Sequence, residues 1–296
     1  MAGHITYDKW ASARGSLKAT GDRFAKLISI VDPHTMATGE WTVAETAAHV
    51  GMIATLYTST VRPGEVPSPF PGLEEAILGA NVDTVSTLNE LAFGHSAERD
   101  PLVLADRLRD DIREILRATA DVDPATPVPW LGDARVPIAG VLAHLVNELL
   151  LHGWDVARAT RTPWALPARD AGLFFDLFLV GMIRNDYGSL MDTGSPAPRR
   201  RIAVGFHSAH TAPAALVLDH GRVSVAEVDA GVDAHVRFDP ATLNLLLFGR
   251  VSRTRAALTG KLAVWGRRPW LLPAFLRFVR LPTTTRPRSH AESVRV

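Results

Sequence analysis

The sequence predicts a two-unit α+β protein in which a helical bundle precedes a smaller α+β unit. Apolar residues recur at helical spacing through most of the first 190 residues, whereas short β-branched segments of alternating polarity follow from about residue 197. A chain of 296 residues is long enough for two such units. We therefore place the bundle at 1–195, the α+β unit at 196–284, and a polar tail that we expect to be disordered at 285–296.

The predicted bundle begins with two helices and a loop. Apolar residues recur at helical spacing over 6–30, so this segment is expected to form the first helix. Thr42 and Glu45 form the pattern of a capping box, which places the start of a second helix at Val43. The prolines of 62–72 cannot donate backbone hydrogen bonds, so this segment is expected to be a loop.

Four further helical segments complete the predicted bundle. Helices are expected over 73–93 and 102–119, and the second has the alternating charges of an exposed face. A proline-rich connection at 121–137 leads to a helix over 138–161, which is apolar nearly all round and therefore expected to be buried. The last helical segment is predicted over 168–191.

The α+β unit is predicted from segments of alternating polarity, each bounded by turn residues. Asp-His-Gly-Arg, residues 219–222, is expected to form the turn between two of its strands. The predicted strands lie in 199–207, 214–228, 233–239 and 260–266, and the predicted helices in 240–251 and 269–281.

Composition narrows the function classes. A formal net charge of +1 argues against broad electrostatic capture of nucleic acid. The chain has no cysteine, so a metal site would have to use His, Asp, Glu or water. Neither a secretory signal pattern nor an apolar run of membrane-spanning length is found, so a cytoplasmic protein without a membrane span is expected.

A polar wedge interrupts the apolar surface of the predicted helix over 138–161. On a helical projection of about 100° per residue, His144, Glu148, His152 and Asp155 fall within an arc of about 80°. Asn147 lies beside this arc. Because buried carboxylates and imidazoles are costly without compensation, the wedge is expected to meet polar partners or a cation.

Glu148 and His152 are one helical turn apart, which allows both to bind one cation. Such a pair suits Zn²⁺ and also Fe²⁺, Ni²⁺ or Mn²⁺, although a structural ion pair explains the spacing equally well. His49, on the second predicted helix, is the candidate third ligand; the alternative is a core histidine with a satisfied hydrogen bond.

Two segments resemble the mycothiol-dependent maleylpyruvate isomerase family of the DinB-like helical-bundle superfamily. In EWTVAETAAHV a tryptophan opens the second helix and His49 follows eight residues later, and NELLLHGWDVARAT contains Glu-x-x-x-His-Gly-Trp-Asp. This resemblance covers about 1–190 and implies a DinB-like four-helix-type bundle. HVRFDPATLNLLLFGRVS and ALTGKLAVWG resemble the sterol-carrier-like α+β domain that often follows the bundle in such proteins.

The resemblance implies that His49, Glu148 and His152 bind a divalent metal, most often zinc, and that mycothiol, the low-molecular-weight thiol of actinobacteria, binds beside it. It further implies isomerisation of a small electrophile or thiol transfer to it. His144 departs from the family pattern, and it could be a fourth ligand, a proton donor near the metal or a helix residue that is hydrogen-bonded elsewhere. We favour a role beside the metal, as a proton donor or as a residue that supports a ligand, because the angular spread already selects Glu148 and His152 as the chelating pair.

Three further residues are candidates for shaping the cofactor site. Asp155 could orient a ligand imidazole or, equally, pair with Arg158 or Arg161 on the helix surface. Trp41 and Trp154 could wall the thiol pocket, with core packing as the alternative.

Two other functions fit the same sequence. One is an apolar-ligand-binding protein without catalysis, and the other is a hydrolase that uses zinc-bound water with His144 as acid–base. Neither the substrate nor the oligomeric state is predicted.

Overall fold

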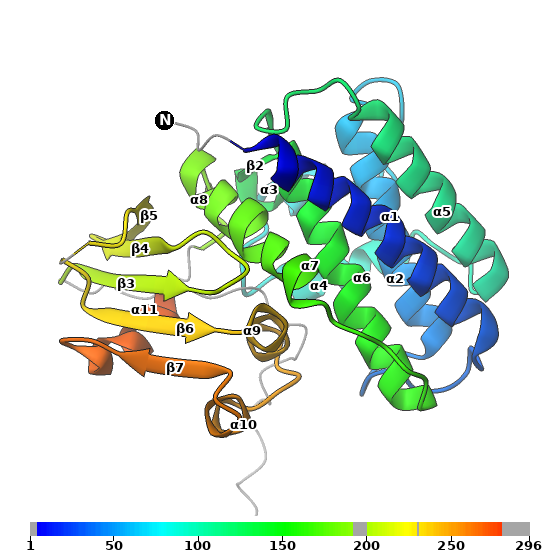
Figure 1. Cartoon of the computed structure of the whole chain (residues 1–296). Helices are drawn as coiled ribbons and strands as arrows, with labels where there is room; N and C mark the ends of the chain where they lie inside the picture. Colours follow the sequence, from blue (N-terminus) through cyan, green and yellow to red (C-terminus); the bar gives the residue numbers. More distant parts are fainter. Residues whose placement is uncertain (1–4, 192–199, 230, 280–296) are drawn as a thin grey trace, which may run out of the picture.

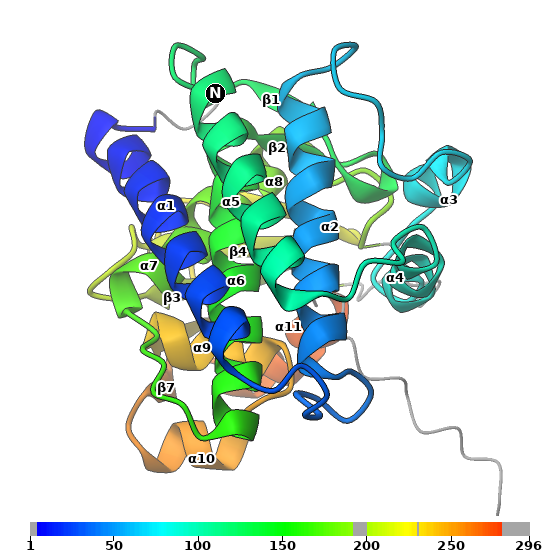
Figure 2. The same cartoon turned by 90° about the vertical axis from the view of Figure 1, so that its right-hand side faces the viewer.

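The computed structural model describes residues 5–191, 200–229 and 231–279. Four long helices form a bundle: α1 (Tyr7–Ile30), α2 (Val43–Val61), α5 (Pro101–Ala118) and α6 (Ile138–Thr160). α1 and α2 each pack against both α5 and α6 (Figure 2). The predicted helical bundle is thus confirmed, and its four long helices begin and end within two residues of the sequence-based limits where these were given.

The region between α2 and α5 differs from the prediction of one helix over 73–93. It forms two short helices, α3 (Glu74–Leu78) and α4 (Val85–Phe93). Between them the side chain of Asn81 accepts hydrogen bonds from the backbone N–H groups of Asp83 and Thr84, at 2.9 and 3.2 Å. This local turn competes with the helical hydrogen-bond ladder and ends it.

The proline-rich connection before α6 is a short hairpin. Strands β1 (Pro127–Pro129) and β2 (Arg135–Pro137) pair antiparallel around a 3₁₀ turn, η1 (Leu131–Asp133). Trp130 stands between β1 and η1 and points toward the bundle interior. The hairpin therefore covers the bundle end where α6 begins.

The helical segment after α6 runs continuously through three forms. α7 (Ala168–Leu173) passes into a π-helical turn, η2 (Phe174–Leu179), and then into α8 (Val180–Asn185). The segment lies between α6 and the sheet (Figure 1). It ends before the limit predicted at 191.

The C-terminal part is a five-stranded sheet of order β5-β4-β3-β6-β7. Its strands are β3 (Ile202–His207), β4 (Ala214–Asp219), β5 (Arg222–Ala226), β6 (Ala234–Phe238) and β7 (Leu262–Trp265). β3 and β6 are parallel, and the other neighbours are antiparallel. The predicted turn at 219–222 is confirmed: His220 and Gly221 both have positive φ, the type I′ geometry of two-residue hairpins.

Three helices and a 3₁₀ turn accompany the sheet. They are α9 (Pro240–Leu247), α10 (Arg253–Leu258), η3 (Pro269–Leu271) and α11 (Leu272–Phe278). α10 was not predicted. The predicted α+β character of this region is confirmed, whereas the predicted junction near residue 196 and the tail at 285–296 lie outside the described residues.

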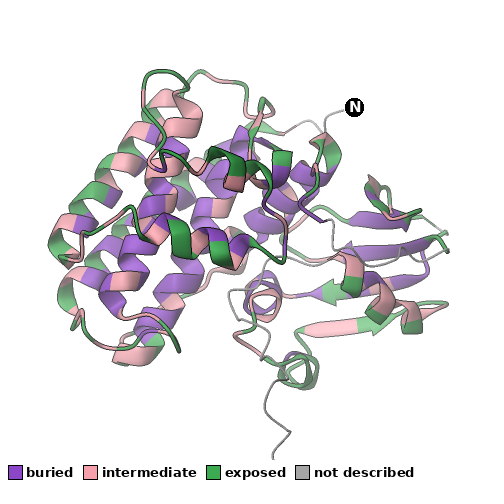
Figure 3. Ribbon diagram, turned by 180° about the vertical axis from the view of Figure 1, so that it is seen from behind, coloured by how far each residue is buried: buried purple, intermediate pink, exposed green. Residues whose placement is uncertain are grey.

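The bundle and the sheet share one apolar core rather than holding separate cores. Phe175 of η2 packs against Phe206 of β3 and Phe238 of β6, with ring centroids 5.4 and 5.1 Å apart. α9 lies against α6 and α7, where Asn244 donates hydrogen bonds to Asn147 Oδ1 and to the Ala171 carbonyl. Buried positions accordingly run from the bundle into the strands (Figure 3).

Within the described ranges, no helix combines the length and the hydropathy that crossing a membrane requires.

A candidate metal centre at the end of an apolar cavity

His49 is positioned by the start of α2. Thr42 accepts a hydrogen bond from the Glu45 backbone N–H, and the Glu45 carboxylate accepts one from Thr42 N, so both halves of the predicted capping box are present. The cap sets where the helix begins, and two turns later the His49 side chain faces α6. The Trp41 ring lies just before the cap, with its centroid 4.7 Å from that of the His49 ring.

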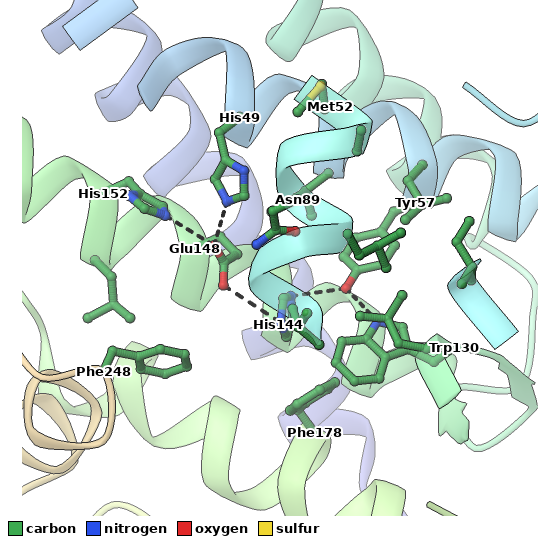
Figure 4. Close-up of a pocket in the computed structure, with 18 of the residues that line it drawn as sticks. His49, Met52, Tyr57, Asn89, Trp130, His144, Glu148, His152, Phe178 and Phe248 are labelled. Carbon is green, nitrogen blue, oxygen red and sulfur yellow. Dashed lines mark hydrogen bonds and ion pairs between the residues drawn. The ribbon is translucent and has the colours of Figure 1, made fainter. Parts of the chain in front are cut away.

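Glu148 and His152 meet His49 across the interface between α2 and α6 (Figure 4). Glu148 Oε2 lies 3.3 Å from His152 Nε2 and 3.8 Å from His49 Nε2. One ligand atom from each residue falls within 4.8 Å of the other two, and all three side chains are buried. The sequence-based prediction that the distant His49 joins the pair on α6 agrees with this placement.

The donor set fits a divalent ion. The separation of 3.8 Å between His49 Nε2 and Glu148 Oε2 is too long for a hydrogen bond. A cation between the two imidazoles and the carboxylate would give His49 Nε2 a partner and would compensate the buried charge of Glu148. Two nitrogens and one oxygen suit zinc and the neighbouring transition metals.

Asp155 is buried beside His152 and supports it. Its Oδ2 lies 3.3 Å from His152 Nδ1, the ring nitrogen that faces away from Glu148. Asp155 also accepts hydrogen bonds from Arg250 Nε, which comes from the turn after α9, at 2.9 and 3.1 Å. Of the two sequence-based interpretations of Asp155, the structure favours the orienting contact, because its ion pair is made with Arg250 rather than with Arg158 or Arg161.

The neighbouring charges shift the pKa values of the cluster in different directions. Burial raises the pKa of Glu148, but the imidazoles of His152 and His49 outweigh burial and hold that pKa well below its usual value. Burial lowers the pKa of His152, yet Asp155 and Glu148 outweigh it and the pKa is raised. His49 has only one carboxylate beside it, so burial prevails and its pKa is lowered. Glu148 is therefore ionised in the centre of the cluster.

His144 lies one turn before Glu148 and belongs to a second polar chain. Trp130 Nε1 donates a hydrogen bond to the Tyr57 hydroxyl at 3.0 Å, and the same hydroxyl lies 3.0 Å from His144 Nδ1. An indole nitrogen can only donate, so the Tyr57 hydroxyl accepts from Trp130 and keeps its own hydrogen, which we assign to a bond with His144 Nδ1. The remaining proton of a neutral imidazole then sits on Nε2, which lies 3.6 Å from Glu148 Oε1. Burial lowers the pKa of His144, which favours this neutral form.

The donor set and His144 both line one cavity of about 120 Å³, which we call the bundle cavity. Its walls come from α2, α3, α4, α6, η2 and α8, and Phe248 and Arg250 reach it from beyond α9. Its polar lining includes the three histidines and Glu148 already described. The other polar side chains that line it are Tyr57, Asn89 and Arg250 (Figure 4). The other lining residues are apolar or aromatic.

The first of the comparisons with known proteins concerns the bundle. Residues 20–157 match the family model described as the mycothiol maleylpyruvate isomerase N-terminal domain. Over these residues the chain is similar to that family. The matched segment includes His49 and Glu148, and it ends after His152 and Asp155, so it contains the whole donor set.

Solved structures show more distant similarity. A crystal structure of the mycothiol-dependent maleylpyruvate isomerase is similar at 14% identity and a TM-score of 0.46, over 82% of this chain and 90% of that one. A mutant structure of the same isomerase is similar at 10% identity and a TM-score of 0.49, over 86% and 92%. Sterol carrier protein 2 from Yarrowia lipolytica is similar at 18% identity and a TM-score of 0.22, over 31% of this chain and 87% of that one. The sequence has no match among curated proteins.

The two tryptophans singled out beside the maleylpyruvate isomerase motifs have different surroundings. Trp41 packs between His49 and Phe93, close to His152. Trp154 is half-buried under the guanidinium of Arg158 and does not line the bundle cavity. Neither tryptophan lines the bundle cavity itself, so neither forms the expected pocket wall; Trp41 instead packs against the imidazoles of His49 and His152.

Sequence reasoning gave no role to Tyr57, Trp130, Asn89 or Arg250. Helical periodicity places Tyr57 on the same face of α2 as His49, two turns later, but it does not supply the hydrogen bonds that Tyr57 makes. Trp130 and Arg250 lie in turns and reach the site only through the tertiary fold, so no local pattern identifies them.

Proposed function

We propose that this chain is a metal-dependent enzyme that uses mycothiol as its thiol cosubstrate, either to isomerise a small electrophile or to transfer the thiol to it. The observation that carries the proposal is the donor set of His49, Glu148 and His152 at the end of a cavity. Three protein ligands are typical of catalytic zinc sites, which keep a further position for a substrate. The match of residues 20–157 to the mycothiol maleylpyruvate isomerase N-terminal domain supports the choice of thiol.

The metal has a simple task in this proposal. A zinc ion held by His49, Glu148 and His152 would lower the pKa of a thiol that reaches it and so supply a thiolate. The chain has no cysteine, so that thiol has to come from another molecule.

The residues around the donor set orient its ligands, offer a hydrogen bond to the substrate and line the substrate space. Asp155 keeps His152 Nε2 turned toward Glu148, and Arg250 holds Asp155 in that orientation. His144, fixed through Tyr57, presents Nε2–H toward the cavity, where it can donate a hydrogen bond or a proton to a substrate oxygen. The apolar walls exclude water from the same space.

Metal content is the first test. The wild type, incubated with zinc and desalted, is expected to retain stoichiometric metal, whereas His49→Ala/His152→Ala retains none. His207→Ala/His235→Ala is the matched control, because it also removes two neighbouring histidines but from the sheet, where their nitrogens lie 3.0 Å apart. Equal, negligible metal in the wild type and the bundle variant would rule out the metal-dependent enzyme.

The thiol is tested separately in the Co²⁺-substituted protein. Mycothiol is expected to change the visible spectrum of the bound cobalt, because a thiolate ligand adds charge-transfer bands. A spectrum that mycothiol leaves unchanged would favour the alternative of hydrolysis by zinc-bound water.

A second candidate function rests on another cavity, which we call the sheet cavity. It measures about 110 Å³ and lies between the sheet, α9, α11 and the segment from η2 to α8. All of its lining residues are apolar, among them Phe175, Leu216, Val236 and Phe275. Binding of an apolar ligand there is compatible with catalysis in the bundle cavity. Retained lipid that is lost in Val236→Trp, without any change in metal content, would support this function.

A further inference from the structure

We propose that the bundle cavity accepts an uncharged, largely apolar electrophile and excludes carboxylic acids. That the substrate is an electrophile rests on the proposed function. That it is uncharged and largely apolar follows from the cavity walls. These walls belong to the part of the cavity away from His49, Glu148 and His152, where the substrate has to lie.

The walls of this part of the cavity are apolar and aromatic. α2 contributes Met52, Ile53 and Leu56 to the cavity, and α4 contributes Val85 and Leu88. The opposite wall is aromatic: Phe174 and Phe178 of η2 stack on each other 5.1 Å apart, and Trp130 meets Phe178 edge-on. Such walls gain free energy by covering an apolar or aromatic group and offer no hydrogen bonds to an anion.

The described lining of the cavity offers no lysine and no unpaired arginine to a carboxylate. Among the described residues that line the cavity, Arg250 is the only arginine, and none is a lysine. Its Nε and Nη2 donate to Asp155, and its Nη1 donates to the Phe248 carbonyl at 3.3 Å. A carboxylate that entered the apolar part would have to leave water without gaining a paired charge there, which is strongly unfavourable.

Few polar side chains line this part of the cavity. His144 lies at its edge, where Nε2 is 3.6 Å from Glu148 Oε1 and can donate a hydrogen bond when Tyr57 donates to Nδ1. Asn89 of α4 points toward the same region (Figure 4). These groups match one or two uncharged oxygens, such as a conjugated carbonyl, rather than a pair of carboxylates. The class therefore differs from maleylpyruvate, a dicarboxylic acid.

The test compares benzylideneacetone with cinnamate, which is of nearly the same shape but carries a carboxylate in place of the methyl ketone. Maleate serves as a small dicarboxylate. Each probe is titrated into the full-length protein after chelation of metal, since a metal ion would itself attract a carboxylate and the walls are under test. The metal-content experiment tests the proposed function and uses none of these probes. A failure of the proposed function can therefore be told apart from a failure of this proposal.

Methionine methyl resonances report which cavity binds. Met52 and Met182 line the bundle cavity, whereas Met191 lines the sheet cavity. With ¹³C-methyl-methionine labelling, Met52→Leu and Met182→Leu assign the resonances with little change in volume.

Benzylideneacetone is expected to shift Met52 and Met182 with a Kd at least about tenfold lower than that of cinnamate, and maleate is expected to shift neither. Cinnamate or maleate binding as tightly at these methyl groups would overturn the proposal, as would benzylideneacetone shifting Met191 alone.

A variant then tests whether charge is the reason. Ile77 is half-buried on the short α3 and lines the cavity, so Ile77→Arg adds a cation without disturbing the bundle core. The preference for benzylideneacetone over cinnamate is expected to fall below about threefold, because the anion gains a partner. An unchanged preference in this variant would contradict the proposal. Ile77→Leu, which keeps the position apolar, is the matched control.

Discussion

The bundle cavity and the sheet cavity have nearly the same volume but opposite chemistry. The first holds an ionised glutamate among three histidines, and the second is lined by apolar side chains throughout. One helical segment forms a wall of both: Phe174, Phe178 and Met182 face the bundle cavity, and Phe175, Leu179 and Ile183, each one residue later, face the sheet cavity. Neighbouring residues of α7–η2–α8 thus serve two different environments.

The difference shows what buried charge demands of a fold. Apolar walls need only complementary shape, so the sheet cavity is built from whichever side chains the sheet and its helices present. The charged cluster needs partners at fixed positions, and it draws them from α2, from the hairpin before α6 and from the turn after α9. The polar site therefore depends on the assembly of the whole chain.

Asp155→Ala is expected to have the largest effect, and on the bundle cavity alone. It leaves Arg250 nearly buried without its carboxylate, which costs about 3–5 kcal/mol of unfolding free energy. Loss of the contact to His152 should also lower zinc affinity about 10–100-fold. Urea unfolding and zinc titration measure the two effects, and exposed Arg158→Ala on the same helix should change neither. A variant as stable as the wild type would show that the ion pair is not essential for stability.

Phe275→Ala is expected to affect the sheet cavity and to leave the bundle cavity unchanged. Phe275 is fully buried, and its removal should cost about 3–5 kcal/mol because it deletes apolar contacts and enlarges the cavity. Zinc affinity should stay within about twofold of the wild type, since the donor set lies in the other cavity. A large fall in zinc affinity, with the protein still folded, would mean that the two cavities are coupled more strongly than their separate linings indicate.

Tyr57→Phe removes one oxygen from the bundle cavity and leaves Trp130 Nε1 and His144 Nδ1 without their partner. We expect a loss of about 1–3 kcal/mol in unfolding free energy and little change in zinc affinity. ¹⁵N NMR of the histidine rings should find His144 protonated at Nε2 in the wild type and as a mixture of tautomers in the variant. His144 protonated mainly at Nδ1 in the wild type would contradict the assigned direction of the chain.

Glu45→Gln should have the smallest effect. Its hydrogen bond to the Thr42 backbone lowers the pKa of Glu45 below the usual 4.5, so the ionised carboxylate stabilises the fold above that value. This stabilisation is lost as the pH falls through the lowered pKa. The variant should be less stable by at most about 1 kcal/mol at pH 7, and the gap should close as the pH falls from 4.5 through the lowered pKa. Urea unfolding over this pH range measures this, and exposed Glu40→Gln is the control; a gap that widened on acidification would contradict the sign.

Local patterns predicted much of the fold and the centre of the site. Helical spacing identified α1, α2, α5 and α6, and the capping pattern located the start of α2. The polar wedge of α6 identified Glu148 and His152. The break between α3 and α4 was missed because it depends on a side-chain turn at Asn81 that competes with a good apolar periodicity.

The sequence alone determined which residues are chemically able to hold a metal and that two of them, Glu148 and His152, share a face of one buried helix. Only the tertiary structure decided which groups complete the site. Arg250 follows Asp155 by 95 positions, and Trp130 and Tyr57 are 73 positions apart, so no local spacing connects them. The physical reason is that helical period is a property of neighbouring residues, whereas compensation of buried charge is a property of whichever groups packing brings together.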